Sequence, residues 1–212
     1  RAANIFMEAG LDFCCGGNKT LGEACNEKGI NTSQIEETLS KLNLTPNSEG
    51  NNFKEWDLDL LCDYIKKKHH RFVKKTLPDL VHYTQKIASV HGANHTELVE
   101  IADLFGQINT ELLQHLKNEE EVLFPAIKEV ISNENSKALA TIKSEIERMA
   151  KEHEFAGGAM DKINELSKSY KVPADGCNTY NVTYNLLHQF ENDLHIHVHL
   201  ENNILYPKAI RL

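Results

Sequence analysis

One sequence pattern occurs twice in this chain and constrains its fold more than any other feature. The stretch from His115 to Pro125 and the stretch from His197 to Pro207 both read H-x-x-x-E-x-x-x-L-aromatic-P. On a helix, residues four apart lie one turn apart on the same face. A single pair of this kind is common, but two copies predict two helices that each direct an imidazole and a carboxylate toward one buried metal site.

The composition is that of an ordinary globular protein. The 212 residues leave room for one medium domain and a small one, with 41% hydrophobic and 25% charged residues. The net charge of −8 argues against binding to nucleic acids or to anionic membranes, and no apolar run approaches the length of a membrane span. Because the chain begins with Arg1 rather than methionine, we expect residues before it, in which a targeting segment would not be visible.

Five cysteines are scattered along the chain, at positions 14, 15, 25, 62 and 177. Their odd number and their spacing match no disulfide framework, which predicts reduced thiols and a cytoplasmic protein. Cys25 and Cys62 lie in helical patterns and are expected to pack. Cys14 and Cys15 precede two glycines and are candidate thiols for metal ligation or disulfide exchange, and the alternative is that they are small residues packed at a helix end.

The pattern predicts an all-α chain in two parts. Residues 1–42 are typical of a compact helical module, and residues 43–56, which are polar with Pro and Gly, are typical of a linker. Residues 57–212 are expected to form an up-down four-helix bundle, because short breaks between long helices make sequential helices antiparallel neighbours. The expected helices run from about 57 to 89, 94 to 131, 136 to 170 and 179 to 210.

The turns between these helices place six side chains at one level of the bundle. In an up-down bundle, residues equidistant from a turn lie at the same height. The first turn brings His70 level with the pair on the next helix, His115 and Glu119. The third turn brings His153 level with His197 and Glu201, and the second turn brings Glu119 level with His153. The predicted layer contains His70, His115, Glu119, His153, His197 and Glu201.

Such a layer predicts a centre with two metal ions. Buried charges must be paired or must coordinate a metal, and bundle cores are known to hold carboxylate-bridged metal pairs. Two carboxylates can bridge the ions while imidazoles occupy the terminal positions. A mixed nitrogen and oxygen set without thiolate favours iron or manganese over structural zinc. One histidine or one H-x-x-x-E pair alone would more often be a surface or core feature, so the repeat with matched heights is what favours the metal site.

Two further groups of residues accompany this layer. The string D-F-C-C-G-G occupies residues 12–17, and V-H-G-A-N-H occupies residues 90–95 in the first turn of the bundle. With the histidines and glutamates of the layer, these residues resemble the repair-of-iron-centres family, which joins a small N-terminal module to a hemerythrin-like bundle. The resemblance covers essentially the whole chain, and D-F-C-C-G-G is its most specific element.

The resemblance implies a non-haem di-iron centre in which the four histidines are terminal ligands and the two glutamates are bridges. The choice of His70 over His69 rests on it. It also implies that the protein repairs or protects iron–sulfur clusters damaged by nitric oxide or oxidative stress, by supplying labile iron. The expected partners are damaged iron–sulfur proteins and nitric oxide or another small diatomic ligand. The Cys14–Cys15 pair is implied to serve that chemistry or a protein contact.

Three alternatives stay open from the sequence. The same centre could reduce nitric oxide to nitrous oxide, which would make the protein an enzyme, or it could bind a gas as hemerythrins do. Oxygen-carrying hemerythrins have H-x-x-x-H on the third helix, whereas His153 is followed four residues later by Gly157. The missing ligand argues for a labile centre and against an oxygen carrier. A purely structural bundle is the last alternative, and a homodimer is expected because the small N-terminal module has little core of its own.

Overall fold

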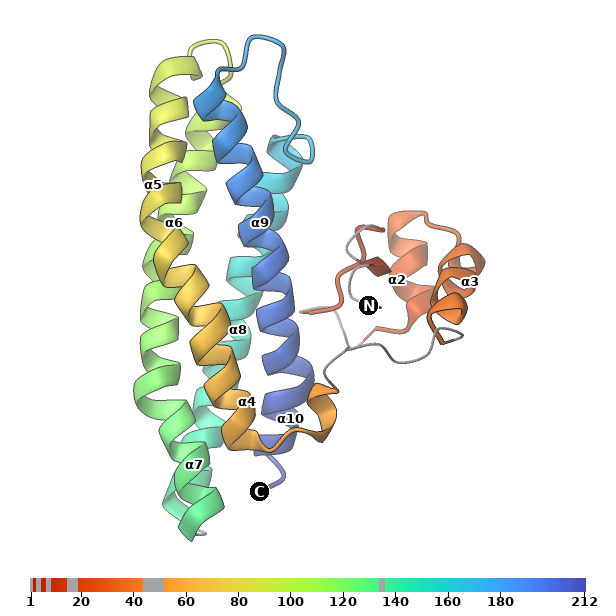
Figure 1. Cartoon of the computed structure of the whole chain (residues 1–212), viewed down its shortest axis with the longest axis vertical. Coiled ribbons are helices and arrows are strands. Elements are labelled where there is room, and N and C mark those ends of the chain that lie inside the picture. Colours follow the sequence, from red (N-terminus) through yellow and green to blue (C-terminus); the bar gives the residue numbers. More distant parts are fainter. Residues whose placement is uncertain (1, 3–4, 7–8, 15–18, 44–51, 134–135) are drawn as a thin grey trace.

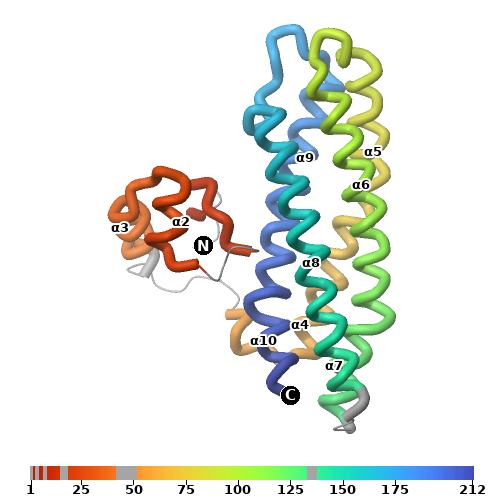
Figure 2. The backbone as a smooth tube through the Cα atoms, turned by 180° about the vertical axis from the view of Figure 1, so that it is seen from behind, coloured from red at the N-terminus to blue at the C-terminus, as the bar shows by residue number. Residues whose placement is uncertain are grey.

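The long helical runs of the chain lie side by side and alternate in direction (Figure 1), and the view from behind shows the same arrangement (Figure 2). The computed structural model describes residues 2, 5–6, 9–14, 19–43, 52–133 and 136–212, and every regular element in those ranges is helical. The predicted all-α, up-down four-helix bundle is confirmed. Within the same ranges, no helix combines the length and the apolar character that a membrane crossing requires.

Each run of the bundle contains one long α-helix, and three of the four also contain a π-helical turn. The first run consists of α4 (Leu58–Ile65), the π-helical turn η2 (Lys66–His70) and α5 (Arg71–His91). The second consists of α6 (Glu97–Asn118), the π-helical turn η3 (Glu119–Leu123) and α7 (Phe124–Asn133). The third is α8 (Ser136–Leu166), and the fourth consists of α9 (Asn178–Leu200), the π-helical turn η4 (Glu201–Leu205) and α10 (Tyr206–Ala209).

The third helix ends earlier than the sequence pattern predicted. The predicted helix reached Tyr170, but α8 ends at Leu166. Three consecutive residues, Lys168, Ser169 and Tyr170, have positive φ angles of 53°, 58° and 59°. This left-handed conformation is uncommon for residues other than glycine and cannot continue a right-handed helix.

Two separate apolar clusters fill the bundle. One cluster lies toward the turn between α5 and α6 and includes Leu77, Phe105 and Phe190. The other lies toward α7 and α10 and includes Ile65, Ile127 and Leu205 among others. Between the two clusters, each run contributes buried histidines or glutamates instead of apolar side chains. The predicted polar layer therefore lies between two apolar halves of the core.

The N-terminal part includes the helices α2 (Leu21–Lys28) and α3 (Thr32–Asn43). A capping box formed by Thr20 and Glu23 starts α2. At the start of α3, the Asn31 side chain accepts the Ser33 N–H (3.1 Å). The short 3₁₀ helix η1 (Phe53–Glu55) precedes the bundle. The segment of residues 11–14 contacts the fourth run of the bundle, where the Asn203 side chain of η4 donates to Phe13 O.

Candidate metal centre

Six buried side chains from the four runs converge at one level of the bundle. None of the six exposes more than 1% of its surface. His70 Nε2 and His115 Nε2 each lie 3.2 Å from Glu119 Oε2. His153 Nε2 lies 3.2 Å from the second oxygen of Glu201, and His197 Nε2 lies 2.8 Å from the first. The residues that meet here are His70, His115, Glu119, His153, His197 and Glu201.

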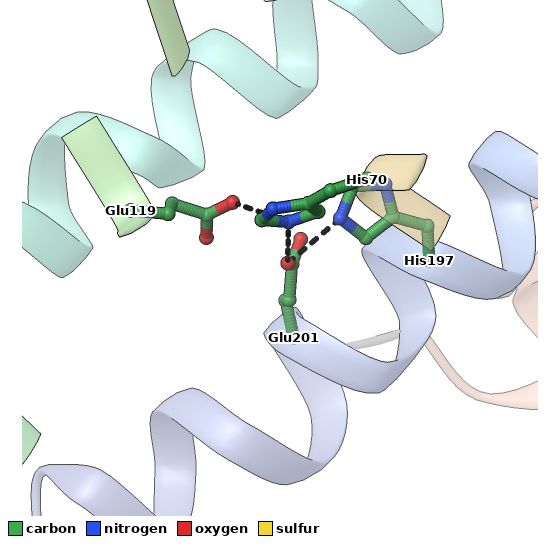
Figure 3. A group of neighbouring side chains, drawn as sticks. All are labelled: His70, Glu119, His197 and Glu201. Atoms are coloured by element: carbon green, nitrogen blue, oxygen red, sulfur yellow. Dashed lines mark hydrogen bonds and ion pairs between the residues drawn. The ribbon is translucent and has the colours of Figure 1, made fainter. Parts of the chain in front are cut away.

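The two glutamates lie between the histidines of different helices. In Figure 3 the His70 ring lies between Glu119 on one side and Glu201 and His197 on the other. The other half of the layer is equally close, because His153 Nε2 and His115 Nε2 are 3.1 Å apart. Two groups of possible ligands share Glu201, and within each group the ligand atoms lie within 4.8 Å of one another. This sharing is the arrangement that a bridging carboxylate requires.

The end of the repeated motif explains how each glutamate is presented. Glu119 and Glu201 each open a π-helical turn, in which the Phe124 N–H donates to Glu119 O and the Tyr206 N–H donates to Glu201 O. A proline follows each of these donors in the motif. Proline lacks an N–H and collides with the carbonyl four residues earlier, and a wider turn relieves that collision. Single π-helical turns occur frequently at functional sites.

The layer contains buried polar atoms that no hydrogen bond satisfies. They include His70 Nε2, Glu119 Oε2 and Glu201 Oε2. His70 Nε2 lies 3.2 Å from Glu119 Oε2 and 3.8 Å from Glu201 Oε1, but neither contact has hydrogen-bond geometry. Buried polar atoms in native proteins are nearly always satisfied. Nitrogen and oxygen lone pairs directed at one space are what a cation would satisfy, and the mixed donor set fits iron.

A second ring of side chains holds the other nitrogen of three imidazoles. His70 Nδ1 lies 2.9 Å from Glu120 Oε1, and His115 Nδ1 lies 2.7 Å from Glu152 Oε2. His153 Nδ1 lies 2.9 Å from Asn202 Oδ1. Such partners fix the tautomer and orientation of an imidazole ligand and raise its basicity. The sequence analysis did not identify these three partners. Each of them is adjacent in sequence to a predicted ligand, and that ligand lies on the run after the one that carries the imidazole.

The fourth imidazole, His197, is supported by stacking. Its ring lies parallel to that of His69, with centroids 5.5 Å apart and an interplanar angle of 9°. His69 Nδ1 in turn lies 3.0 Å from Asp193 Oδ1. The structure therefore places His70 in the layer and His69, which is equally buried, behind it.

Tyr206 closes the layer from the fourth run. Its hydroxyl donates to Glu119 Oε1 over 2.9 Å, and its ring stacks on His153 with an interplanar angle of 3°. Burial and the charges of Glu119 and Glu201 raise its pKa well above the ordinary value, so the hydroxyl stays protonated and remains a donor. The aromatic position of the repeated motif thus has a polar role in its second copy.

Comparison with known proteins agrees with this geometry. Residues 63–209 match the hemerythrin HHE cation binding domain, and residues 1–43 match ScdA_N, a domain of unknown function. The chain is 34% identical over 212 residues to the iron–sulfur cluster repair protein ScdA of Staphylococcus epidermidis, covering 99% of this chain and 92% of the relative. It is 33% identical over 211 residues to the iron–sulfur cluster repair protein YtfE of Yersinia pestis, covering 100% of this chain and 92% of the relative. This chain belongs to the ScdA/YtfE family. Its hemerythrin-like domain is a cation-binding domain, and its His/Glu clusters could bind metal.

In this ScdA/YtfE family member, charge and burial act in opposite directions on the layer. Burial opposes protonation of His70 and His115, but Glu119 and Glu201 outweigh it and raise their pKa values to about 9 and about 10. Burial also opposes ionisation of the two glutamates. The histidines nevertheless lower the pKa of Glu119 to about 2, and they lower the pKa of Glu201 well below 4.5. Burial lowers the pKa of His197 and favours its neutral ring.

The predicted N-terminal thiols are only partly described. Cys14 is buried, its N–H donates to Asp12 Oδ1 (2.9 Å), and its thiol lies 3.2 Å from the same oxygen. Cys15 lies outside the described residues. Among the residues that the structure describes, no group of converging metal-binding side chains contains a cysteine. Cys25 and Cys62 are buried, as their helical patterns predicted.

A third group of possible ligands lies outside the layer. Asp161 of α8 and Glu191 and His195 of α9 place ligand atoms within 4.8 Å of one another. The Asn164 side chain donates to both oxygens of the buried Glu191, at 3.1 and 3.0 Å. Because that hydrogen bonding already satisfies the one deeply buried member, the group does not show the unsatisfied atoms of the main layer.

Proposed function

We propose that this chain is a di-iron protein that repairs or protects iron–sulfur clusters damaged by nitric oxide or oxidative stress, by supplying labile iron. The observation that carries the proposal is the convergence of four imidazoles and two carboxylates at one level of the bundle. The relatives are named iron–sulfur cluster repair proteins, which supports the same role. Its partners would be iron–sulfur proteins of the cytoplasm.

The roles of the residues follow from their contacts. Glu119 and Glu201 would bridge the two ions, and His70, His115, His153 and His197 would complete the coordination. When bound, the ions would supply exchangeable ferrous iron. The two apolar clusters exclude water from above and below the layer. His70 and His115 would have to be neutral at Nε2 to hold a metal ion, because only the neutral imidazole is a ligand.

Metal content and repair activity test the proposal directly. Protein purified without oxygen is expected to hold about two irons per chain and to reactivate a hydratase whose iron–sulfur cluster was damaged by nitric oxide. Glu119→Leu and Glu201→Leu are each expected to lose both properties. Glu121→Leu is the matched control, because Glu121 is exposed in the same π-helical turn as Glu119. A single zinc ion per chain, or full iron content in both leucine variants, would overturn the proposal.

A second candidate function is the reduction of nitric oxide to nitrous oxide at the same centre. The observation that favours it is that α8 provides one histidine to the layer and carries Gly157 one turn later, where a further ligand is expected in oxygen carriers. Catalytic release of nitrous oxide by the reduced protein without oxygen would support it. Stoichiometric uptake of nitric oxide with no nitrous oxide released would exclude it.

A further inference from the structure

The outer partners of the three held imidazoles are not chemically equal. His70 and His115 are held by the carboxylates of Glu120 and Glu152. His153 is held by the neutral amide of Asn202, whose oxygen accepts from Nδ1 over 2.9 Å. A carboxylate partner increases the electron density on the coordinating nitrogen more than an amide does. The amide partner therefore strengthens the coordinating nitrogen of His153 less than a carboxylate partner would.

The same amide also contacts the N-terminal part of the chain. The other end of the side chain, Asn202 Nδ2, lies 3.4 Å from the carbonyl oxygen of Cys14. We call residues 11–14 the cysteine segment. One planar amide thus contacts the backbone of this segment at one end and an imidazole of the layer at the other. Because the amide is rigid, the contact at Cys14 fixes the orientation in which Oδ1 faces His153.

Neighbouring side chains on the fourth run hold the segment in place without reaching the layer. Asn203 Nδ2 donates to Phe13 O over 3.1 Å, and His199 Nδ1 lies 3.3 Å from the same oxygen. The Phe13 ring packs edge-on against His199, with centroids 5.5 Å apart. Cys14 itself belongs to the buried apolar cluster of the bundle. Asn203 is therefore a docking contact alone, whereas Asn202 is both a docking contact and a partner of His153.

We propose that Asn202 is a positioning residue that couples docking of the cysteine segment to the strength of the His153 ligand, and thereby sets the rate of iron release. The inference rests on the proposed di-iron centre. When the segment is docked, the amide is oriented and His153 is held for coordination. When the segment leaves, the amide loses its outer anchor and His153 its fixed orientation, so that iron is released more readily.

The test is a double-mutant cycle on the iron-loaded full-length protein, with iron transfer to excess ferrozine as the readout. Asn202→Ala is expected to release iron roughly tenfold faster, which is the lower end of the effect of removing an outer partner of a metal ligand. Asn203→Ala removes a docking contact and is expected to accelerate release roughly threefold. In the Asn202→Ala background, Asn203→Ala is expected to have no further effect, because the coupling passes through Asn202.

One further measurement separates positioning from a general loss of structure. Mössbauer spectra of Asn202→Ala are expected to change for one of the two irons only. Additive effects in the cycle, an unchanged rate in Asn202→Ala, or Mössbauer changes at both irons would each overturn the proposal. Failure of the unaltered protein to hold two irons would instead overturn the proposed function.

Discussion

At the scale of single residues, the layer buries positively charged imidazoles and negatively charged carboxylates, and each charge is stabilised by the opposite charges around it. Removing one charged member would leave its partner buried and uncompensated, which costs several kcal/mol in general. A bound metal ion would take the place of the protons on His70 and His115, and the carboxylates would stay ionised. Metal ions therefore bind to a layer in which His70 and His115 are protonated. The pH consequently affects both the stability of the metal-free protein and its affinity for metal.

The first prediction concerns the pH dependence of the metal-free protein. The pKa values of His70 and His115 are raised from 6.5 to about 9 and about 10, so their stabilisation is complete below pH 6.5 and is lost as pH rises through 9 to 10. The pKa of Glu119 is lowered from 4.5 to about 2, so its contribution is complete above 4.5 and is lost as pH falls toward 2. Urea midpoints of the stripped protein should peak between about pH 4.5 and 6.5.

The control for this prediction is an exposed histidine on the same run. His82→Asn should leave the pH profile unchanged, because His82 is exposed on α5. Glu119→Gln should flatten the alkaline limb, because it removes the charge that raises both imidazole pKa values. A midpoint that rises between pH 6.5 and 9.5 in the unaltered protein would contradict the prediction.

A second prediction concerns the exposed Cys177, which directly precedes α9. Its contact with the His91 side chain, together with the Tyr180 N–H, lowers its pKa to about 7. Burial raises the pKa of Cys62 to about 12. Because the thiolate is the reactive form, brief treatment with iodoacetamide at pH 7 should alkylate Cys177 well before Cys62, as measured by peptide mass spectrometry. His91→Asn should slow modification of Cys177, and equal rates for the two cysteines would refute the assignment.

At the scale of elements, the π-helical turns determine how the repeated motif orients its side chains relative to the layer. The turns η3 and η4 begin at the two glutamates that face the layer, and a proline is the second residue after each turn. A regular α-helix in their place would rotate every later side chain by about 100° relative to the ligands. We therefore interpret the prolines of the motif as the residues that select the wider turn.

The third prediction tests this role with Pro207→Ala. Alanine restores the missing donor and removes the ring that the wider turn accommodates, so η4 should relax toward a regular α-helix and the metal-free protein should unfold at higher urea concentration. Relaxation of η4 should displace Glu201, and iron should be released faster. Pro173→Ala is the matched control, because Pro173 lies in the loop before α9. Unchanged iron release in a stabilised Pro207→Ala protein would show that the turn does not depend on the proline.

At the scale of the whole molecule, the helices and the level of the layer could be predicted from the sequence, because both depend only on counting residues from the turns. The N-terminal contacts could not, because Phe13 and Asn203 are far apart in sequence and no periodicity relates them. The outer partners Glu120, Glu152 and Asn202 depend on the rotation of each helix, which the π-helical turns alter. The left-handed residues after α8 also give no sequence signal, since none of them is glycine.

A fourth prediction follows from the position of the layer between the two apolar clusters. Free metal at a thousand times its dissociation constant stabilises the folded protein by about 4 kcal/mol. For a chain of this length, that corresponds to an increase of roughly 8–16 °C in Tm. Calorimetry of iron-loaded and chelator-stripped protein should show this difference, and Glu201→Leu should show none. Equal Tm values for the loaded and stripped forms would indicate a purely structural bundle.

The division of the core has a consequence for the life of the protein in the cell. The two apolar clusters meet across the buried layer of charged groups. Without a metal ion, we expect this layer to open more readily than either cluster, because it contains buried polar atoms that no hydrogen bond satisfies. Metal binding is expected to couple the two apolar clusters, so that the bundle unfolds as one cooperative unit. We expect proteases to cut the unloaded chain near this layer first, and the abundance of the protein would then follow the supply of iron.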